Sequence, residues 1–272
     1  MKIIDSDNYA ASGIETMFFP GGEPHVKIPR FTEKLLLHLK LRTLNDTMFA
    51  ALLQNALHYQ GIEFTSFIPY FPGARQDRSD GLAPLTAQVL GNLLWCSYST
   101  YVFDPHSEKL IDFIGFEPLM PVDLQWWAPP RPVVGVIAPD AGAHYRALKY
   151  LRAFHPDATL FECSKKRDPQ TGHLSSYVMP SLEKVGRYVI VDDICDGGGT
   201  FNLLASAFLA DDVGIKSNLE LFVSHGIFSK GLDNLHECID HITTTDSWCQ
   251  LPSNERLTVI PLLSNLMKHL GE

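Results

Sequence analysis

The most informative segment of this chain is Tyr188-Val-Ile-Val-Asp-Asp-Ile-Cys-Asp-Gly-Gly-Gly-Thr200. Its first residues are apolar and β-branched and predict a buried strand, and residues 201–210 have the pattern of a helix. Three acids and three consecutive glycines lie between them. Because a glycine inside regular structure costs about 0.5–1 kcal/mol relative to alanine, three in a row indicate that the backbone approaches another group closely.

A glycine-rich turn that opens a helix is typical of an anion site. Free backbone N–H groups and the positive end of the helix face the ligand, which is most often a phosphate. Asp192 and Asp193 follow the predicted strand and could bind hydroxyl groups or a metal ion beside that phosphate. The alternative is an ordinary strand–turn–helix connection in which glycine only supplies a positive φ angle.

The composition excludes several classes of protein. Among the 272 residues, 45% are hydrophobic and 19% charged, as expected for a soluble globular protein of one or two domains. A net charge of −9 argues against a nucleic-acid or anionic-membrane binder. No apolar run approaches the ~20 residues of a membrane span, and the N-terminus lacks a signal-peptide core. The five cysteines form no CxxC pair, which predicts reduced thiols and a cytoplasmic location, with Cys195 a small filler.

Short apolar segments alternate with segments of helical periodicity along the whole chain, which predicts an α/β fold with mostly parallel strands flanked by helices. Further strands are expected at residues 2–5, 35–41, 64–71, 99–106, 133–140, 158–161, 219–225 and 257–263. Helices are expected at residues 47–58, 85–94 and 144–154, with Asn45 or Asp46 as the cap of the first.

A proline-rich segment divides the chain. Trp126-Trp-Ala-Pro-Pro-Arg-Pro132 has three prolines in four positions, which neither a helix nor a central strand tolerates. We therefore place a domain boundary near residue 128. The two halves, 1–128 and 129–272, have similar lengths and the same rhythm of strands and helices. We expect two related α/β domains, with the loop 192–200 in the second.

Acidic, basic and histidine side chains recur where the predicted strands end. Open α/β sheets bind ligands at the carboxyl ends of their strands, so these residues could share one site. Carboxylates and histidine suit Mg²⁺ or sugar hydroxyls, whereas lysine and arginine suit phosphoryl oxygens. Each also has a structural explanation when taken singly, such as a helix cap or a solvated face. The residues are Asp104, His106, Asp140, Lys165, Arg167, Asp192, Asp193 and Asp196.

Seven segments in chain order resemble the ribose-phosphate diphosphokinase (phosphoribosyl pyrophosphate synthetase) family. The glycine-rich loop also resembles the ribose-phosphate loop of type I phosphoribosyltransferases. Ala74-Arg-Gln-Asp77 and His225-Gly-Ile-Phe-Ser229 are uncommon outside the diphosphokinase family. The seven segments are residues 18–23, 68–78, 104–106, 139–142, 165–167, 191–200 and 224–229.

This resemblance implies two phosphoribosyltransferase-like domains and a Mg²⁺-dependent transfer of the β,γ-diphosphoryl group of ATP to the anomeric hydroxyl of ribose 5-phosphate. The products would be phosphoribosyl pyrophosphate and AMP. Such a transfer requires in-line positioning and neutralisation of charge, with no covalent enzyme intermediate. The resemblance also implies a homo-oligomer, with dimers that assemble into hexamers.

The resemblance assigns roles residue by residue. Lys165 and Arg167 would stabilise the transferring diphosphoryl group, and Phe19 would stack on adenine from a neighbouring subunit. The remaining ATP-site residues would be Glu23, Arg75, Gln76, Asp77 and His106. The metal ligands would be His106, Asp140 and Asp104. Asp192 and Asp193 would bind the ribose hydroxyls, and the 5-phosphate would bind Asp196, Gly197, Gly198, Gly199 and Thr200.

Three departures from the family pattern qualify these assignments. Gly197 stands where the family loop usually has threonine, and Gly73 where it usually has tyrosine. The loop 78–84 is short and lacks the usual basic and hydroxyl residues, so phosphate activation and ADP inhibition do not carry over. Glycine at position 197 removes a polar contact and leaves open room at that end of the pocket, and a lost polar contact relaxes specificity. Gly197 therefore suggests a larger 5-substituted acceptor such as ADP-ribose. The alternative is neutral drift, because backbone N–H groups alone can hold a phosphate.

Two other classes of protein would share part of this pattern. A phosphoribosyltransferase that consumes the activated sugar would have the loop 192–200, but not the segments 18–23 and 74–77. A silent regulatory subunit of a synthetase would have no need to keep Lys165, Arg167 and the paired aspartates.

Overall fold

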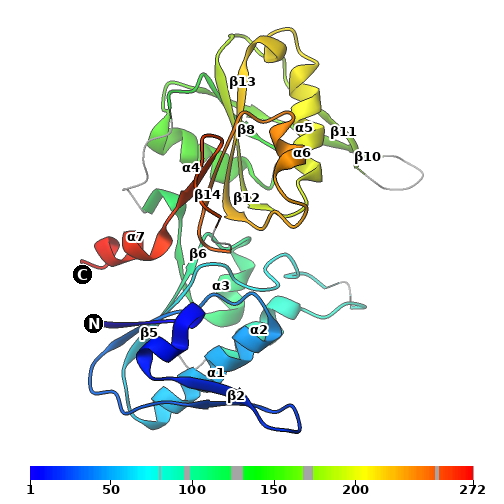
Figure 1. Ribbon diagram of the computed structural model, residues 1–272. Coiled ribbons are helices and arrows are strands. Elements are labelled where there is room, and N and C mark those ends of the chain that lie inside the picture. Colours follow the sequence, from blue (N-terminus) through cyan, green and yellow to red (C-terminus); the bar gives the residue numbers. More distant parts are fainter. Residues whose placement is uncertain (80, 95–98, 124–130, 168–173, 249–250, 272) are drawn as a thin grey trace. The chain divides into compact units, whose positions relative to one another are not determined.

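The computed structural model describes every residue except 80, 95–98, 124–130, 168–173, 249–250 and 272. Its contacts divide the chain into two compact units, which are traced in Figure 1. Unit 1 comprises Met1–Leu124 and Leu262–Glu272, and unit 2 comprises Gln125–Pro261.

Unit 1 is built on a five-stranded parallel sheet with the strand order β1-β4-β5-β6-β7. These strands are β1 (Lys2–Asp5), β4 (Leu35–His38), β5 (Phe64–Ile68), β6 (Ser99–Phe103) and β7 (Glu117–Leu119). An antiparallel hairpin, β2 (Glu15–Phe18) and β3 (Pro24–Lys27), stands apart from the sheet. The helices are α1 (Leu44–Tyr59), α2 (Thr86–Leu93), α3 (Lys109–Ile114) and α7 (Leu262–His269), with 3-10 turns η1 (Ser6–Ser12) and η2 (Pro121–Asp123).

Helix α1 begins at a capping box rather than at the expected caps. The Thr43 hydroxyl accepts a hydrogen bond from the Asp46 N–H at 3.2 Å, and the Asp46 carboxylate accepts one from the Thr43 N–H at 2.7 Å. Thr43 has extended backbone angles, so the helix starts earlier than predicted and Asp46 falls at its third position. The prediction of Asn45 or Asp46 as the cap was therefore wrong.

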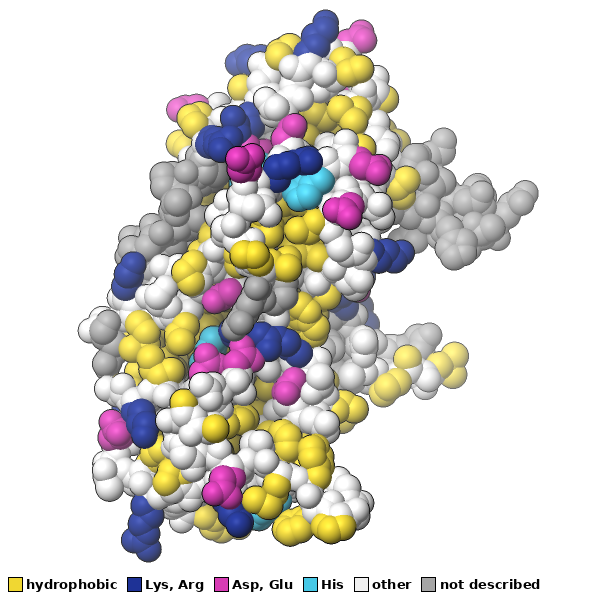
Figure 2. Space-filling model, viewed as in Figure 1, with side chains coloured by type: hydrophobic (Ala, Val, Ile, Leu, Met, Phe, Trp, Pro, Cys, Tyr) yellow, Lys and Arg dark blue, Asp and Glu magenta, His cyan; other side chains and the backbone are white. Residues whose placement is uncertain are grey.

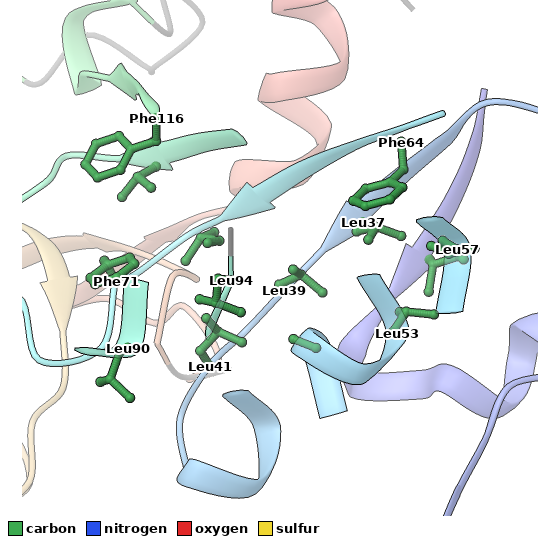
Figure 3. Close-up of a cluster of buried hydrophobic side chains, with 14 of the residues drawn as sticks. Leu37, Leu39, Leu41, Leu53, Leu57, Phe64, Phe71, Leu90, Leu94 and Phe116 are labelled. Carbon is green, nitrogen blue, oxygen red and sulfur yellow. The ribbon is translucent and has the colours of Figure 1, made fainter. Parts of the chain in front are cut away.

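The two faces of the unit 1 sheet bury different helices because side chains alternate along each strand. Leu35 and Leu37 of β4 join the core beneath α1 and α2, part of which Figure 3 shows. Leu36 of the same strand points to the other face and packs with Leu262 and Leu266 of α7. Each fully buried side chain of this kind contributes about 1.5–3 kcal/mol relative to an exposed one.

The last helix thus belongs to the first compact unit, whereas we had assigned residues 129–272 as a whole to the second domain. The sequence does not show that the chain returns to unit 1 at its end, because an amphipathic terminal helix could pack on the core of either unit. The expected boundary near residue 128 lies outside the described residues. The compact units divide between residues 124 and 125.

Unit 2 is built on a six-stranded parallel sheet with the strand order β15-β14-β13-β12-β8-β9. Its strands are β8 (Gly135–Ala138), β9 (Thr159–Glu162), β12 (Arg187–Cys195), β13 (Asn218–Gly226), β14 (His241–Thr245) and β15 (Leu257–Ile260). A separate antiparallel hairpin is formed by β10 (Ser164–Arg167) and β11 (Leu174–Val178). The helices are α4 (His144–Phe154), α5 (Gly199–Leu209) and α6 (Asp233–His236), with the 3-10 turn η3 (Gly214–Lys216).

Helices α4 and α5 cover opposite faces of this sheet. Tyr150 of α4 packs with Val191 and Phe222, and Phe208 of α5 packs with Tyr188. The predicted α/β fold with mostly parallel sheets is confirmed in both units. The hairpins and β14 were not predicted as strands. The polar residues of β10 and the threonines of β14 give no apolar run from which to recognise a strand.

No described helix combines the length and apolar character needed to cross a membrane. On the face shown in Figure 2, lysine and arginine side chains are dispersed among acidic ones and form no continuous basic patch.

We predict that Leu266→Ala destabilises unit 1. The substitution leaves a cavity against β4 and β5, so the opening free energy of their amides should fall by about 2–5 kcal/mol. Native-state hydrogen exchange measures this quantity strand by strand. Lys268→Ala, at an exposed position of the same helix, is the control and should change it by less than about 0.5 kcal/mol. Equal effects of the two variants would contradict the packing of α7.

Candidate active site

The glycine-rich loop connects β12 to α5 at the carboxyl edge of the unit 2 sheet. Gly198 occupies the N-cap position of α5 with a left-handed φ of 75°, which glycine adopts without strain. No side chain caps the helix, so the N–H groups of its first turn remain available to a ligand. The backbone therefore forms a turn of the kind that holds a phosphate.

The segment after β13 fixes this loop from the neighbouring strand. The Cys195 carbonyl accepts hydrogen bonds from the N–H groups of Ile227 and Phe228, at 2.9 and 3.1 Å. The Ser229 N–H donates to the Asp196 carbonyl at 3.2 Å, and its hydroxyl donates to the Asp196 carboxylate at 2.5 Å. The segment 226–229, which we call the clamp, therefore holds the glycine-rich turn in place.

The clamp has a strained and crowded backbone. Phe228 has a φ of 48°, which is unfavourable for a bulky residue. Its ring folds back so closely that a Cβ atom at Gly226 would lie 2.2 Å from it. Glycine is thus required at position 226, and a strained residue persists only where its surroundings over-determine it.

Asp192 and Asp193 lie within the last four residues of β12, whereas the sequence predicted them just after the strand, and their surroundings differ. Asp193 is buried, and one of its carboxylate oxygens lies 3.9 Å from Nη2 of Arg146 in α4. The Asp193 N–H donates to the Asp192 carboxylate at 2.9 Å. Burial, together with the charge of Asp193, raises the pKa of Asp192 well above its usual range. Asp192 is therefore a carboxyl group that readily holds a proton in the absence of ligands.

Asp140 and Lys165 form an ion pair within the same unit. Asp140 follows β8, and its carboxylate accepts hydrogen bonds from the N–H groups of Gly142 and Ala143, at 2.8 and 3.1 Å. Burial alone would raise the pKa of Asp140, but Lys165 and these N–H groups outweigh it and lower the pKa. Lys165 lies on β10, and Arg167 follows on the same strand.

Tyr177 joins the hairpin to the glycine-rich loop. It is the cross-strand partner of Lys165 on β11, and it belongs to the core that includes residues of α5. Its hydroxyl is buried near Thr200 without a hydrogen-bond partner of ordinary geometry among the described residues. Burial and the charges of Asp140 and Asp192 raise its pKa. Lys165 and the loop are thus parts of one packed assembly.

Unit 1 brings the expected ATP-site segments together at its own sheet edge. Asp77 is buried, and its carboxylate accepts a hydrogen bond of 2.5 Å from the Ser107 hydroxyl. Asp77 and Ser107 follow the adjacent parallel strands β5 and β6, so the bond joins the segments 74–78 and 104–107. Asp104 is fully buried, whereas Arg75, Gln76 and His106 are exposed.

Gly73 has a structural explanation for its departure from the family pattern. It adopts a φ of 69° in a turn whose Gln76 N–H donates to the Gly73 carbonyl at 2.8 Å. A Cβ atom would lie 3.2 Å from the Thr86 side chain. A tyrosine would be both strained and crowded at this position.

Phe19 and Glu23 lie at the tip of the β2–β3 hairpin. The Phe19 N–H donates to the Glu23 carbonyl at 2.9 Å, and 48% of the Phe19 side chain is exposed. Phe18 beside it is 50% exposed, although its ring contacts Phe49 of α1. The tip thus presents aromatic rings to its surroundings, as a residue that stacks on a base from a neighbouring subunit would require.

The described residues contain no group of three or more His, Cys, Asp or Glu side chains placed to hold a metal ion. Mg²⁺ commonly binds through one or two carboxylates together with substrate phosphates, so Asp140 at the sheet edge fits such a role. Cys195 is buried, and burial raises the pKa of its thiol to about 12. Its thiol is therefore unsuited to nucleophilic catalysis, in agreement with the predicted filler role.

The sequence analysis did not identify four residues that lie near these sites, namely Ser107, Arg146, Tyr177 and Lys230. Ser107 and Lys230 each directly follow a recognised motif, which was a signal that could have found them. Arg146 and Tyr177 carry no such signal, because only the packing of α4 and of the hairpin brings them near the loop.

Comparison with known proteins gives a consistent set of relatives, although no family model matches the chain. The ribose-phosphate pyrophosphokinase of Caulobacter vibrioides (strain NA1000 / CB15N) is 32% identical over 231 residues, which cover 78% of this chain and 72% of that protein. The ribose-phosphate pyrophosphokinase of Sulfurisphaera tokodaii is 27% identical over 272 residues, covering 91% and 88%. The crystal structure of phosphoribosylpyrophosphate synthetase from Mycobacterium smegmatis matches with a TM-score of 0.76 at 18% identity, over 100% and 99% of the two chains.

We predict that Asp192→Asn stabilises the protein in a pH-dependent way. A carboxyl group with a raised pKa in the folded state binds its proton more tightly there than in the unfolded chain, so its ionisation destabilises the fold as pH rises. The gain in melting temperature over the parent should be absent near pH 4 and should grow towards about pH 8. Scanning fluorimetry across this range measures it, with the exposed Asp212→Asn as control. A gain that is constant with pH would contradict the raised pKa.

Proposed function

Because the chain belongs to the ribose-phosphate pyrophosphokinase family and is an enzyme of phosphoribosyl pyrophosphate synthesis, we propose that it transfers the β,γ-diphosphoryl group of ATP to the anomeric hydroxyl of ribose 5-phosphate. The observation that carries this proposal is the arrangement in unit 2. There the glycine-rich turn, the paired aspartates and the ion pair of Lys165 with Asp140 lie on one packed sheet edge.

The acceptor binds at the glycine-rich loop. The 5-phosphate accepts hydrogen bonds from backbone N–H groups of the loop and of the uncapped first turn of α5, and it lies at the positive end of that helix. Asp192 and Asp193 bind the ribose hydroxyls. Because a neutral Asp192 carboxyl can donate as well as accept a hydrogen bond, its raised pKa suits recognition of a hydroxyl group.

The diphosphoryl donor is ATP bound as its Mg²⁺ complex. Residues 75–77, His106 and Asp104 contribute from unit 1, and Phe19 and Glu23 contribute from the hairpin of a neighbouring subunit. Asp140 offers a carboxylate to the Mg²⁺ ion. When bound, this ion would neutralise negative charge on the transferring phosphates. The enzyme is then a cytoplasmic homo-oligomer, and the exposed aromatic tip at Phe18 and Phe19 supports a subunit contact.

Lys165 and Arg167 neutralise charge on the diphosphoryl group as it moves between oxygens. In the ligand-free structure Lys165 is paired with Asp140. Donor binding places phosphoryl oxygens within reach of the Lys165 ammonium. The lysine then exchanges the Asp140 carboxylate for the diphosphoryl group. Tyr177 behind Lys165 fixes the strand on which this exchange takes place.

The larger acceptor that Gly197 suggested is not favoured. The expectation was that glycine leaves open room at the end of the phosphate loop. Instead, a Cβ atom at Gly197 would meet Cε and Cδ of Lys230 at 3.4 and 3.5 Å, so a side chain from the neighbouring segment already covers that position.

We predict that Lys165→Ala lowers kcat for AMP release from ATP and ribose 5-phosphate by at least about a hundredfold, because it removes charge stabilisation from the transition state. The exposed Lys184→Ala in the same unit is the control and should retain parent activity. A Lys165→Ala protein that works at the parent rate would refute the assignment. The parent should also prefer ribose 5-phosphate to ADP-ribose, and the opposite preference would restore the larger acceptor.

A further inference from the structure

Lys230 lies against the glycine-rich loop although it comes from another part of the chain. Its Cε, Cδ and Cγ atoms would be 3.4, 3.5 and 3.8 Å from a Cβ atom built on Gly197. Cε carries the ammonium group directly, so the positive charge lies one bond beyond the first of these contacts. The lysine stem therefore runs along the face of the loop that Gly197 leaves without a side chain.

The backbone holds Lys230 in this place. Ser229, its predecessor, is bonded to Asp196 through both its N–H and its hydroxyl group. Gly231, its successor, closes a turn in which the Gly231 N–H donates to the Phe228 carbonyl at 2.8 Å, with a φ of 75°. Lys230 is thus the residue at the corner of a fixed turn, and its side chain is exposed.

The loop needs a cation that its own sequence does not provide. Residues 192–200 contain three aspartates and no lysine or arginine. Nearby, Lys165 is paired with Asp140, and Arg146 lies beside Asp193. A phosphate dianion brought to this loop would face three carboxyl groups, with backbone N–H groups and the Thr200 hydroxyl in its favour but no positive charge from the loop itself. Lys230, by contrast, is a cationic side chain whose stem lies directly against Gly197 in the phosphate-binding part of the loop.

We propose that Lys230 is a binding and specificity residue for the acceptor phosphate, and that it replaces from the adjacent segment the contact that position 197 lacks. This inference rests on the proposed function. The ammonium donates to a terminal oxygen of the 5-phosphate, and its stem packs on Gly197. Acceptors without a 5-phosphate gain nothing from it, so Lys230 raises the discrimination between ribose 5-phosphate and ribose.

Lys230→Met tests this role because methionine keeps much of the stem on Gly197 but removes the charge. We expect the KM for ribose 5-phosphate to rise between about three- and tenfold, as for loss of a partly exposed charged contact. The kcat and the KM for ATP should change by less than about twofold. Lys230→Arg should restore the KM. Lys216→Met, an exposed lysine in the turn that follows the other end of α5, is the matched control.

Binding measured without turnover separates this inference from the proposed reaction. Calorimetry should show that Lys230→Met weakens binding of ribose 5-phosphate by the same factor and leaves binding of ribose unchanged. If the parent binds ribose 5-phosphate but releases no AMP, the proposed reaction fails while the role of Lys230 is still tested. Unchanged affinity in Lys230→Met, or an equal loss in Lys216→Met, would overturn the inference.

Discussion

The Cys195 carbonyl accepts two backbone hydrogen bonds, from Ile227 and Phe228, and the arrangement of the unit 2 site depends on this junction. It joins the end of β12 to the end of β13, which are neighbours in the sheet. The junction requires the tight turn that places Phe228 at a positive φ and its ring over Gly226. The strain of that turn is offset by burial of the ring and by the bonds between Ser229 and Asp196.

This junction brings the segment that carries Lys230 against the glycine-rich loop and its two aspartates. The clamp holds the loop from the side of β13, and the first turn of α5 carries no side-chain cap. Meanwhile, Tyr177 holds the Lys165 hairpin from the side of α5. On the proposed function, anion binding at this edge would rest on backbone N–H groups and on a few cationic side chains.

The parts of the fold with strong apolar patterns could be predicted from sequence. The buried strands β8, β12 and β13 are clear apolar runs, and the helices between them have clear helical periodicity. The glycine-rich turn is recognised from its composition. The hairpin of Lys165 could not be predicted from an apolar pattern, because β10 consists of polar residues only. The position of α7 could not be predicted because an amphipathic helix does not specify which core it joins.

Part of the candidate site could likewise be predicted from the sequence, and part could not. Asp77, Asp104, Asp140 and the glycine-rich loop lie at the edges of the two parallel sheets, whereas Phe19, Glu23, Lys165 and Arg167 lie on the separate hairpins. What the sequence could not show is that Lys230 covers Gly197, since a contact between two loops depends on the register of β12 and β13. Position 197 taken alone therefore predicts open room at the end of the loop, whereas the fold places the Lys230 side chain there.

Phosphorus NMR of the reaction products tests the central claim most directly. With ATP, Mg²⁺ and ribose 5-phosphate, the account predicts equal amounts of AMP and a sugar that carries a diphosphate on its anomeric carbon and keeps its 5-phosphate. Formation of ADP, free diphosphate or orthophosphate without such a sugar would contradict it.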